Sequence, residues 1–404
     1  MPTYTYRAKS FNGQEESGSL EAKSESQLAG LLKQEGLVLI SAQEKGLAKK
    51  KRMEISLFSR VPITEKLMFA RNLKVLISAG VVLPRSLDLL AQQTRSKKLS
   101  GTILAVKDRI IKGTSFSDAL LGFPDVFSEL FGSMIKVGEA GGKLEEVLGL
   151  LEKQMARQHE MSSKIKGALA YPAVIILAML GIGAMMLLVV VPKLAETFET
   201  LQIELPPSTQ FVIWLGQTMA SRWYVVLLVL AVSLFLLARA LKTEIGKKVL
   251  SFLSLKAPII SPIIKKANSA QTIRTLSSLI TAGVPITRSL EILSESLGNF
   301  YYRKAMIVAA EEVRKGSNLS DALSSYSYIY SPLVIQMMAV GEETGQTAEI
   351  LEKLADFYEE EVANVTKNLT SIIEPIIMLF IGAAVGFFAI SMIQPMYSML
   401  GSVQ

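Results

Sequence analysis

The segment RNLKVLISAGVVLPRSLDLL (residues 71–90) returns later in the chain as RTLSSLITAGVPITRSLEIL (residues 274–293), with 11 of 20 positions identical. The offset is 274 − 71 = 203 residues, and two further pairs of segments keep it without a gap. These pairs are GTSFSDAL at 113–120 with GSNLSDAL at 316–323, and VGEAGGKLEEVL at 137–148 with VGEETGQTAEIL at 340–351. A constant offset indicates an internal duplication, so the chain contains two copies of a module of about 130 residues.

Within each copy, the apolar residues predict amphipathic helices. Leu144, Leu148 and Leu151 recur at steps of four and three residues, the spacing that lines one face of a helix. Glycine and proline turn signals divide the earlier part of each copy into shorter helices. The sequence therefore predicts a mainly α fold with two homologous six-helix bundles, at residues 63–169 and 266–372, each leading directly into a membrane span.

The stretch VGEAGGKL at residues 137–144 places glycines before a lysine, as a phosphate-binding loop does. Such a loop needs a serine or threonine hydroxyl after the lysine to hold magnesium, and Leu144 stands there instead. The second copy has Gln346 in place of Lys143. We therefore predict a helix–turn–helix corner in each copy and no nucleotide site.

A set of residues kept at the turns of both copies is the candidate partner-binding or structural motif: Gly80, Gly138, Glu139 and Gly142 in the first copy, and Gly283, Gly341, Glu342 and Gly345 in the second. We expect the glycines, Gly138 included, to adopt positive φ where a helix stops. The two glutamates have two interpretations. Either they cap or pair within the corner, which we favour, or they bind a cation or a basic residue of a partner.

The composition excludes several classes of active site. The 404 residues include no cysteine and a single histidine, which rules out a thiolate nucleophile, a Cys-ligated metal and a His-based triad. That histidine, His159, aligns with Val362 in the second copy. No acid and base pair recurs between the copies. We therefore predict no catalytic site, no metal site and no cofactor, and we do not expect the protein to be an enzyme.

Three apolar runs predict transmembrane helices at residues 170–191, 223–240 and 373–393. The first holds 22 residues without a charge, enough to cross a hydrocarbon core that needs about 20 helical residues. A mean hydropathy of +0.36 also suits a membrane protein. The alternative for each run is a buried helix of a soluble protein, and it is weakest for the two outer runs. Because each module ends in a span, the unduplicated middle span is needed to return the second module to the side of the first.

The placement of lysine and arginine predicts the orientation in the membrane. Basic residues gather beside the spans on one side: Lys164, Lys166, Arg239, Lys242, Lys247, Lys248 and Lys367. The other side has Lys193 and Arg222, and the tail at 394–404 has no basic residue. By the positive-inside rule, we expect the N-terminus and both modules in the cytoplasm, with the loop at 192–222 and the tail outside.

Residues within or beside the spans are candidates for helix packing or kinks: Pro172, Glu374, Pro375, Gly382 and Gly386. The prolines are expected to kink the long helices near the membrane surface. The two glycines are four residues apart and let helices approach closely, but glycine is also common in membrane helices, so oligomer packing is one of two interpretations. Glu374 is expected at the head-group boundary.

The first 45 residues predict a separate domain. Alternating residues around Tyr4 and Tyr6, a turn, a helix and a further strand indicate a small α+β domain at residues 1–45. A linker at residues 46–62 follows and contains KKKR at 49–52. In a membrane protein this basic run is expected to face lipid or solvent rather than nucleic acid.

These features together resemble one family. The motifs SAGV…RSL and VGE…G in each copy, the three predicted spans and the N-terminal sequence YTYRAKSFNGQEESGSLEA are similar to the GspF/PilC family, the inner-membrane platform proteins of type II secretion systems and type IV pili. The resemblance covers essentially the whole chain. It implies a scaffold in the bacterial cytoplasmic (inner) membrane that couples a cytoplasmic hexameric assembly ATPase to insertion or extraction of pilin or pseudopilin subunits.

The resemblance also implies contacts with other inner-membrane assembly proteins, with membrane lipids and with further copies of the chain as a homo-oligomer, and no contact with nucleic acid. In some family members acidic residues of the first module bind a metal, but no such ligands can be assigned in this sequence. The alternative function is a subunit of a membrane transporter or channel. It is disfavoured because three spans are few, most of the mass lies outside them, and no span carries a charge at its centre.

Overall fold

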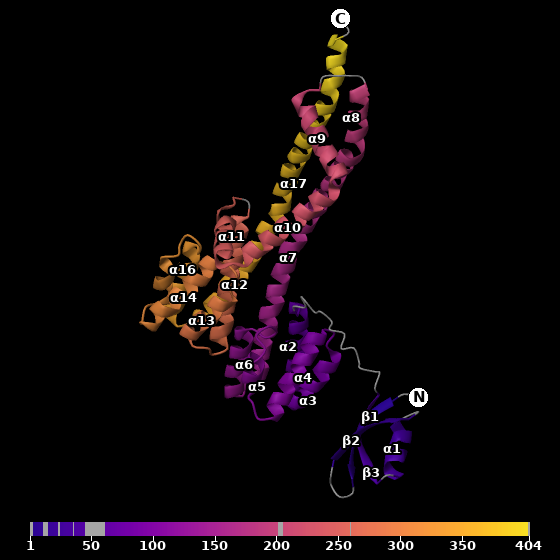
Figure 1. Ribbon diagram of the computed structural model, residues 1–404. Helices are drawn as coiled ribbons and strands as arrows, with labels where there is room; N and C mark the ends of the chain where they lie inside the picture. The colour runs from indigo at the N-terminus through magenta and orange to yellow at the C-terminus, as the bar shows by residue number, and fades with distance from the viewer. Residues whose placement is uncertain are drawn as a thin grey trace. The chain divides into compact units, whose positions relative to one another are not determined.

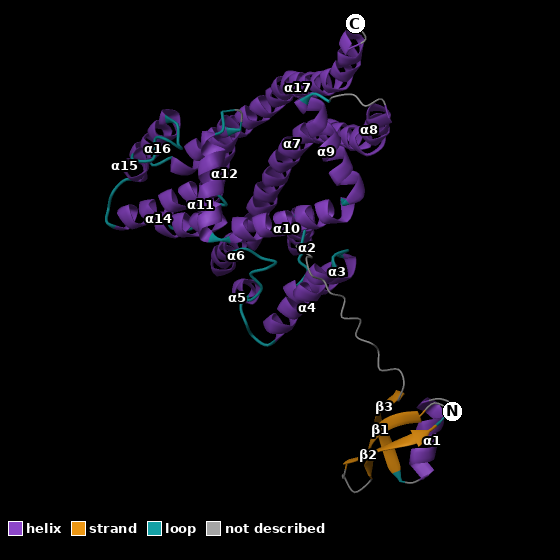
Figure 2. Cartoon of the chain, turned by 45° about the horizontal axis from the view of Figure 1, so that its top comes forward, coloured by secondary structure: helices purple, strands orange, loops and turns teal. Residues whose placement is uncertain are grey.

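The computed structural model describes residues 3–10, 15–22, 25–34, 36–44, 61–200, 205–258 and 260–402. The chain divides into two compact units, residues 1–60 and 61–404. Most of the predicted linker at 46–62, including the basic run at 49–52, lies outside the described residues. Among the described residues, strands occur only in the first unit, and the second unit is helical (Figure 2).

The N-terminal unit is a small α+β fold. Its elements are β1 (Thr3–Ser10), β2 (Glu15–Glu21), α1 (Glu25–Gln34) and β3 (Leu37–Glu44). The strands form an antiparallel sheet in the order β2-β1-β3. Leu28 and Leu32 of α1 are fully buried in a core with Ala8, Ala22 and Leu37. The predicted α+β domain is therefore confirmed, and its core is small.

The second unit contains two bundles of six helices each. The first bundle consists of α2 (Ile63–Ser78), α3 (Leu83–Gln93), α4 (Lys97–Ile111), α5 (Phe116–Leu121), α6 (Glu129–Gly141) and α7 (Leu144–Met185). The second consists of α12 (Ser261–Thr281), α13 (Ile286–Ser296), α14 (Phe300–Arg314), α15 (Leu319–Ser324), α16 (Pro332–Thr344) and α17 (Thr347–Ser402).

The helix boundaries repeat with the offset found in the sequence. Adding 203 to the bounds of α3 gives 286–296, the bounds of α13, and the same holds for α4 with α14, α5 with α15 and α6 with α16. The first residue of α7, Leu144, likewise maps onto Thr347, the first residue of α17. The predicted pair of homologous six-helix bundles is therefore confirmed.

Each bundle has an apolar core, and Leu279, Val284 and Ile292 of the second module are buried in the core of the first. In the first, the rings of Phe69, Phe127 and Phe131 pack together with centroids 5.1 to 6.3 Å apart. In the second, Tyr302 and Tyr330 are fully buried and meet edge to face at 5.0 Å. Burial raises the pKa of both tyrosines, so both hydroxyls stay neutral. Aromatic residues bury large apolar areas, and these clusters therefore anchor the bundles.

In the part of the chain that the structure describes, three helices are long and apolar enough to cross a membrane. The first is a continuous helix in which α7 passes through a π-helical turn, η1 (Met186–Val190), into α8 (Val191–Thr200). The second is α10 (Trp223–Lys242), and the third is the later part of α17. Figure 1 shows α7 and α17 as long helices that extend away from the two bundles. The chain is therefore an integral membrane protein, with α11 (Glu244–Lys256) between the second span and the second bundle.

The segment predicted as a loop at 192–222 is largely helical. It contains most of α8 and all of α9 (Pro207–Ser221), which pack against each other and against α17 in a small apolar cluster. A hydrogen bond between α9 and α17 also forms here, one turn before a proline of α17. Pro395 has no N–H to donate to the Ser391 carbonyl one turn earlier, and the buried Thr209 hydroxyl donates to that carbonyl instead. The predicted loop is a helical hairpin because its apolar residues recur at helical spacing.

Candidate functional site

The acidic residue at the corner of the first module caps a neighbouring helix. The Glu139 carboxylate, near the end of α6, accepts hydrogen bonds from the backbone N–H groups of Phe116 (2.7 Å) and Ser117 (3.0 Å) at the start of α5. It also accepts one from the Ser117 hydroxyl at 2.8 Å. The first N–H groups of a helix have no partner within the helix, and a negative charge there is favourable.

The second module builds the same contact. The Glu342 carboxylate accepts from the backbone N–H groups of Leu319 and Ser320 at the start of α15, and from the Ser320 hydroxyl at 2.6 Å. The serine to which each glutamate bonds belongs to the repeated SDAL segment. The two repeated motifs VGE and SDAL are therefore the two halves of one tertiary contact, which ties α6 to α5 and α16 to α15.

The glycines at this corner divide into two groups. Gly142 and Gly345 end α6 and α16 with φ of 66° and 71°, and Gly80 and Gly283, just after α2 and α12, have φ of 77° and 87°. The backbone at these positions favours glycine because a side chain is strained there.

Gly138 and Gly341 do not have positive φ, so that part of the expectation was wrong. Both lie inside helices, and a Cβ at residue 138 would stand 2.9 Å from the Cγ2 atom of Val147. At residue 341 a Cβ would stand 3.1 Å from the Cα atom of Thr347. These two glycines let α6 and α16 lie against the start of the following helix.

The lysine of the VGEAGGKL stretch is a surface residue. The Lys143 side chain is 67% exposed and lies 3.6 Å from Glu146. The stretch forms the end of α6, a turn and the start of α7. Among the described residues, no group of three or more histidine, aspartate or glutamate side chains is placed to hold a metal ion.

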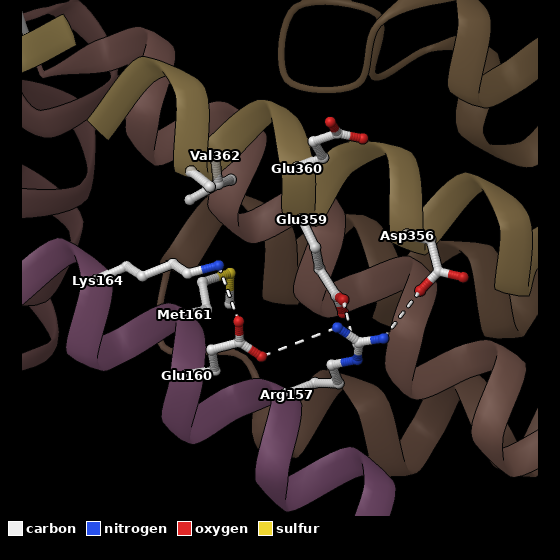
Figure 3. Close-up of a pocket in the computed structure, with 9 residues that line it drawn as sticks. Arg157, Glu160, Met161, Lys164, Asp356, Glu359, Glu360 and Val362 are labelled. Carbon is white, nitrogen blue, oxygen red and sulfur yellow. Dashed lines mark ion pairs between the residues drawn. The ribbon is translucent and has the colours of Figure 1, made fainter. Parts of the chain in front are cut away.

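A charged pocket lies where α7 of the first module crosses α17 of the second (Figure 3). Its lining comes from two helices: Arg157, Glu160, Met161 and Lys164 of α7, and Asp356, Glu359, Glu360, Val362 and Ala363 of α17. The guanidinium of Arg157 lies 3.7 Å from a Glu359 oxygen and 3.8 Å from an Asp356 oxygen. Glu160 pairs with Lys164 at 2.8 Å. This hydrogen bond and the charge of Lys164 lower the pKa of Glu160.

A buried arginine from a third helix, α12, also belongs to this cluster. Arg274 of α12 has only 6% of its side chain exposed and donates two hydrogen bonds to Glu359, at 2.7 and 3.0 Å, and one to Asp356. Burial lowers the pKa of Arg274, but the hydrogen bonds and charges of Glu359 and Asp356 outweigh it, and the net shift is upward. The carboxylates of Asp356 and Glu359 therefore each form ion pairs with two arginines, one from each module.

Buried polar groups join the modules next to this cluster. The Gln154 side chain of α7 donates to the Thr275 hydroxyl at 2.9 Å and accepts from the Ser278 hydroxyl at 3.0 Å. Sequence reasoning missed this junction. Arg274 aligns with Arg71 in the repeat, yet Arg71 pairs with Glu152 at the surface of its own module. The sequence shows that the two arginines occupy equivalent positions of the repeat, but it does not show that they pair with different residues.

The residues predicted for membrane-helix packing or kinks lie on two long helices, Pro172 on α7 and the other four on α17. Pro172 and Pro375 are inside the continuous helices α7 and α17. Glu374 is half-buried beside Pro375. A Cβ added at Gly382 or Gly386 would meet no atom within 4 Å, so among the described residues no neighbouring helix packs closely on either glycine.

Comparisons with known proteins agree with this architecture. The family described as "Type II secretion system (T2SS), protein F" matches residues 69–192 and 272–395, two segments that are again 272 − 69 = 203 residues apart. The family described as "Type II secretion system protein F, N-terminal domain" matches residues 1–43.

Relatives align over nearly the full chain. The Type IV pilus assembly protein PilC of Myxococcus xanthus is 30% identical over 99% of this chain and 96% of its own length. That of Thermus thermophilus is 30% identical over 100% of this chain and 99% of its own. The Type II secretion system protein F of Vibrio cholerae is 29% identical over 99% of this chain and 98% of its own length.

Proposed function

Because the chain belongs to the type II secretion system protein F family, we propose that it is the inner-membrane assembly platform of a type II secretion system or a type IV pilus. In this role it couples a cytoplasmic hexameric assembly ATPase to the addition or removal of pilin or pseudopilin subunits. The names of the aligned relatives, which are pilus assembly and secretion system proteins, support the platform role. The observation that carries the coupling is the continuity of α7 and α17, which lead from the two bundles into the membrane.

The proposal includes an orientation. Both modules and the N-terminal unit lie in the cytoplasm, and the α8–α9 hairpin lies on the opposite side. Basic residues beside the spans support this, since Arg239 and Lys242 end α10 while α8 and α9 together hold one lysine, Lys193. In this arrangement an ATPase reaches both bundles, and the three spans are available to the apolar helix of a pilin.

A labelling experiment tests the orientation. The chain has no cysteine, so single cysteines can be placed at Lys112 and at its counterpart Lys315, since 112 + 203 = 315. Both are exposed, as is Gln210 of α9. In intact cells, a membrane-impermeant thiol reagent should label Gln210→Cys and neither of the other two. Labelling of Lys315→Cys without lysis would place the second module outside and contradict the proposal.

The coupling itself is tested by removing the N-terminal unit. We infer that this unit and the first module contact the ATPase, because the unit is a separate fold with little core of its own. Deletion of residues 2–45 should preserve membrane insertion, which depends on the spans. It should abolish both the co-purification of the ATPase with the protein and the assembly of fibres. A truncated protein that still recovers the ATPase and builds fibres at normal levels would refute the coupling role of this unit.

A further inference from the structure

The short helix α11, between the second span and the second bundle, carries most of its apolar residues on its outer face. It packs on α12 and α14 through a side that holds Ser251 and the partly buried Leu255 (Figure 1). The buried Ser251 hydroxyl accepts a hydrogen bond from the Phe300 N–H at 3.1 Å. The outer face holds five large apolar residues that are 44–77% exposed: Ile245, Val249, Leu250, Phe252 and Leu253. A helix of a soluble protein turns such a stripe toward the core, so the outer face of α11 is suited to an apolar environment.

A tight corner joins α11 to the second span. A single residue, Thr243, separates Lys242, the last residue of α10, from Glu244, the first of α11. The Thr243 hydroxyl accepts from the Gly246 N–H at 3.0 Å and donates to the Ala240 carbonyl of α10 at 2.6 Å. A Cβ at residue 246 would stand 1.9 Å from the same carbonyl oxygen, so glycine lets the two helices approach this closely. The corner therefore holds the start of α11 at the end of the span, where the hydrocarbon core meets the head groups.

The charges of α11 suit an anionic surface. The helix holds three lysines and one glutamate, a net charge of 3 − 1 = +2. Lys247 pairs with Glu244 at 2.7 Å, whereas the ammonium groups of Lys248 and Lys256 lie over aromatic rings, 5.8 and 4.8 Å from the ring centroids. In the part of the chain that the structure describes, Lys248 and Lys256 form no ion pair with a carboxylate. At 3.6 residues per turn, Lys247 and Lys248 lie on either side of the apolar face, as in helices that lie on anionic membranes.

An aromatic patch of the second bundle begins next to α11. The Phe300 ring, over which Lys248 lies, meets the Tyr301 ring edge to face at 5.6 Å. Tyr301 meets Tyr328 in the same way at 6.4 Å, and Tyr326 lies 6.1 Å from Tyr328. Tyr328 is 51% exposed. Tyrosine has an apolar ring and a polar hydroxyl, and it is therefore enriched where a protein meets the head groups of a membrane.

The duplication shows that this patch is particular to the second module. Subtracting 203 from the numbers of its four residues gives their counterparts in the first module: Lys97, Lys98, Phe123 and Asp125. Lys98 lies 3.9 Å from Asp125, so the first module has an ion pair where the second has the ring contact between Tyr301 and Tyr328. An exposed ion pair is suited to water and a pair of tyrosine rings to the membrane interface. The change from one to the other occurs in the module against which α11 packs.

We propose that α11 lies on the surface of the membrane, with its outer apolar residues among the acyl chains and its lysines on the phosphate groups of anionic phospholipids. The aromatic patch continues this contact at the level of the head groups. The occupant of the face is lipid, because a corner joins α11 directly to a span and basic residues flank its apolar stripe. The inference goes beyond the proposed function and beyond the contact of acyl chains with the three spans, because α11 lies outside the spans and selects lipid by charge.

Spin labels on single cysteines test the depth of α11 in the cysteine-free full-length chain. The labels are attached at Val249→Cys or Leu253→Cys, and the protein is reconstituted into nanodiscs of phosphatidylcholine and phosphatidylglycerol. We expect both labels to be relaxed more by dissolved oxygen, which concentrates in the bilayer, than by a water-soluble nickel chelate. The matched control, Ile111→Cys, replaces an apolar residue of α4 that is 66% exposed, and it should show the opposite order. Both leaflets of the nanodisc have the same composition, so the result does not depend on which side of the membrane the modules occupy.

A second measurement tests the preference for anionic lipid. Replacing phosphatidylglycerol with phosphatidylcholine should increase the relaxation of the Val249→Cys label by the nickel chelate. A triple variant that removes the lysines of α11 should lose this dependence on lipid charge: Lys247→Gln, Lys248→Gln and Lys256→Gln. The matched control removes three exposed lysines outside α11 and should keep the dependence: Lys112→Gln, Lys143→Gln and Lys315→Gln.

Three results would overturn the proposal. Nickel relaxation at both α11 positions as strong as at the Ile111→Cys control would place the helix in water. Shielding of both labels from oxygen and from nickel would show that protein covers the face. Equal relaxation of the Val249→Cys label in the two lipid mixtures would show that α11 does not select anionic lipid. The platform role stands apart from these results, because it is tested by recovery of the ATPase and by fibre assembly.

Discussion

Removing the carboxylate of Glu139 should loosen the start of α5 without unfolding the rest of the module. Glu139→Ala leaves the N–H groups of Phe116 and Ser117 without their acceptor. Hydrogen bonds to a charged group contribute about 1.5–3 kcal/mol each, and the partly exposed site lets water replace some of the loss. We therefore expect the free energy of local opening to fall by about 2–3 kcal/mol, at the upper end of the cost of losing a helix cap.

Hydrogen exchange of the full-length protein in detergent measures this change directly. Since about 1.4 kcal/mol corresponds to a factor of ten, the amides of Phe116 and Ser117 should exchange roughly 30- to 140-fold faster in Glu139→Ala. Glu342→Ala should accelerate the start of α15 and leave α5 unchanged. The matched control is Glu146→Ala, which removes an exposed carboxylate whose ion pair among the described residues is with Lys143 at 3.6 Å.

Three results would refute the capping role. Unchanged exchange at α5 in Glu139→Ala would show that the carboxylate does not hold these N–H groups. Equal acceleration in the Glu146→Ala control would show that any lost charge at the corner has the same effect. If a chelator accelerated exchange at α5 in the unsubstituted protein, the glutamate would instead hold a cation.

Three further predictions follow from the described contacts. Gly138→Val should destabilise the first module by about 1–3 kcal/mol in thermal unfolding, because its side chain would overlap the start of α7, while Gly141→Ala should be neutral, since a Cβ there meets no atom within 4 Å. The hydrogen bond and charge of Lys107 lower the pKa of Asp88, so this pair stabilises the fold above the usual carboxyl pKa and is lost as the pH falls; the melting temperatures of Asp88→Asn and the unsubstituted protein should therefore differ at pH 7 and converge at about pH 2. Lys143→Ala should leave assembly intact, and ATP hydrolysis by the purified protein that this substitution abolished would contradict the surface role of the lysine.

The repeated helices could be predicted because their signals are local. A turn glycine and an apolar stripe act over a few residues, and the duplication supplied each signal twice. The hairpin formed by α8 and α9 was expected as a loop although its stripe was present: Val191, Ala195 and Phe198 recur at steps of four and three and are buried together. That stripe was overlooked because the segment lies between two much more apolar runs.

The junction between the modules could not be predicted, because it depends on which faces meet. Arg71 and Arg274 are identical in the repeat, but the first pairs at the surface and the second is buried against Glu359. Likewise, Gly138 was correctly singled out and given the wrong physical reason. A glycine that accommodates a neighbouring helix and a glycine that needs positive φ have the same sequence signal.

The uninterrupted helix from Leu144 through Met185 also has a mechanical consequence. Its 42 residues extend over roughly 60 Å at 1.5 Å per residue, from the capped corner of the first module into the membrane. The helix runs on through Pro172 as one element, from the part that belongs to the bundle into the part that spans the bilayer. Because one helix belongs to both parts, a rotation of the bundle is expected to tilt or rotate the span that continues from it. The second bundle continues into the membrane in the same way through α17, and the ion pairs of Arg157 join α7 and α17 where these helices cross.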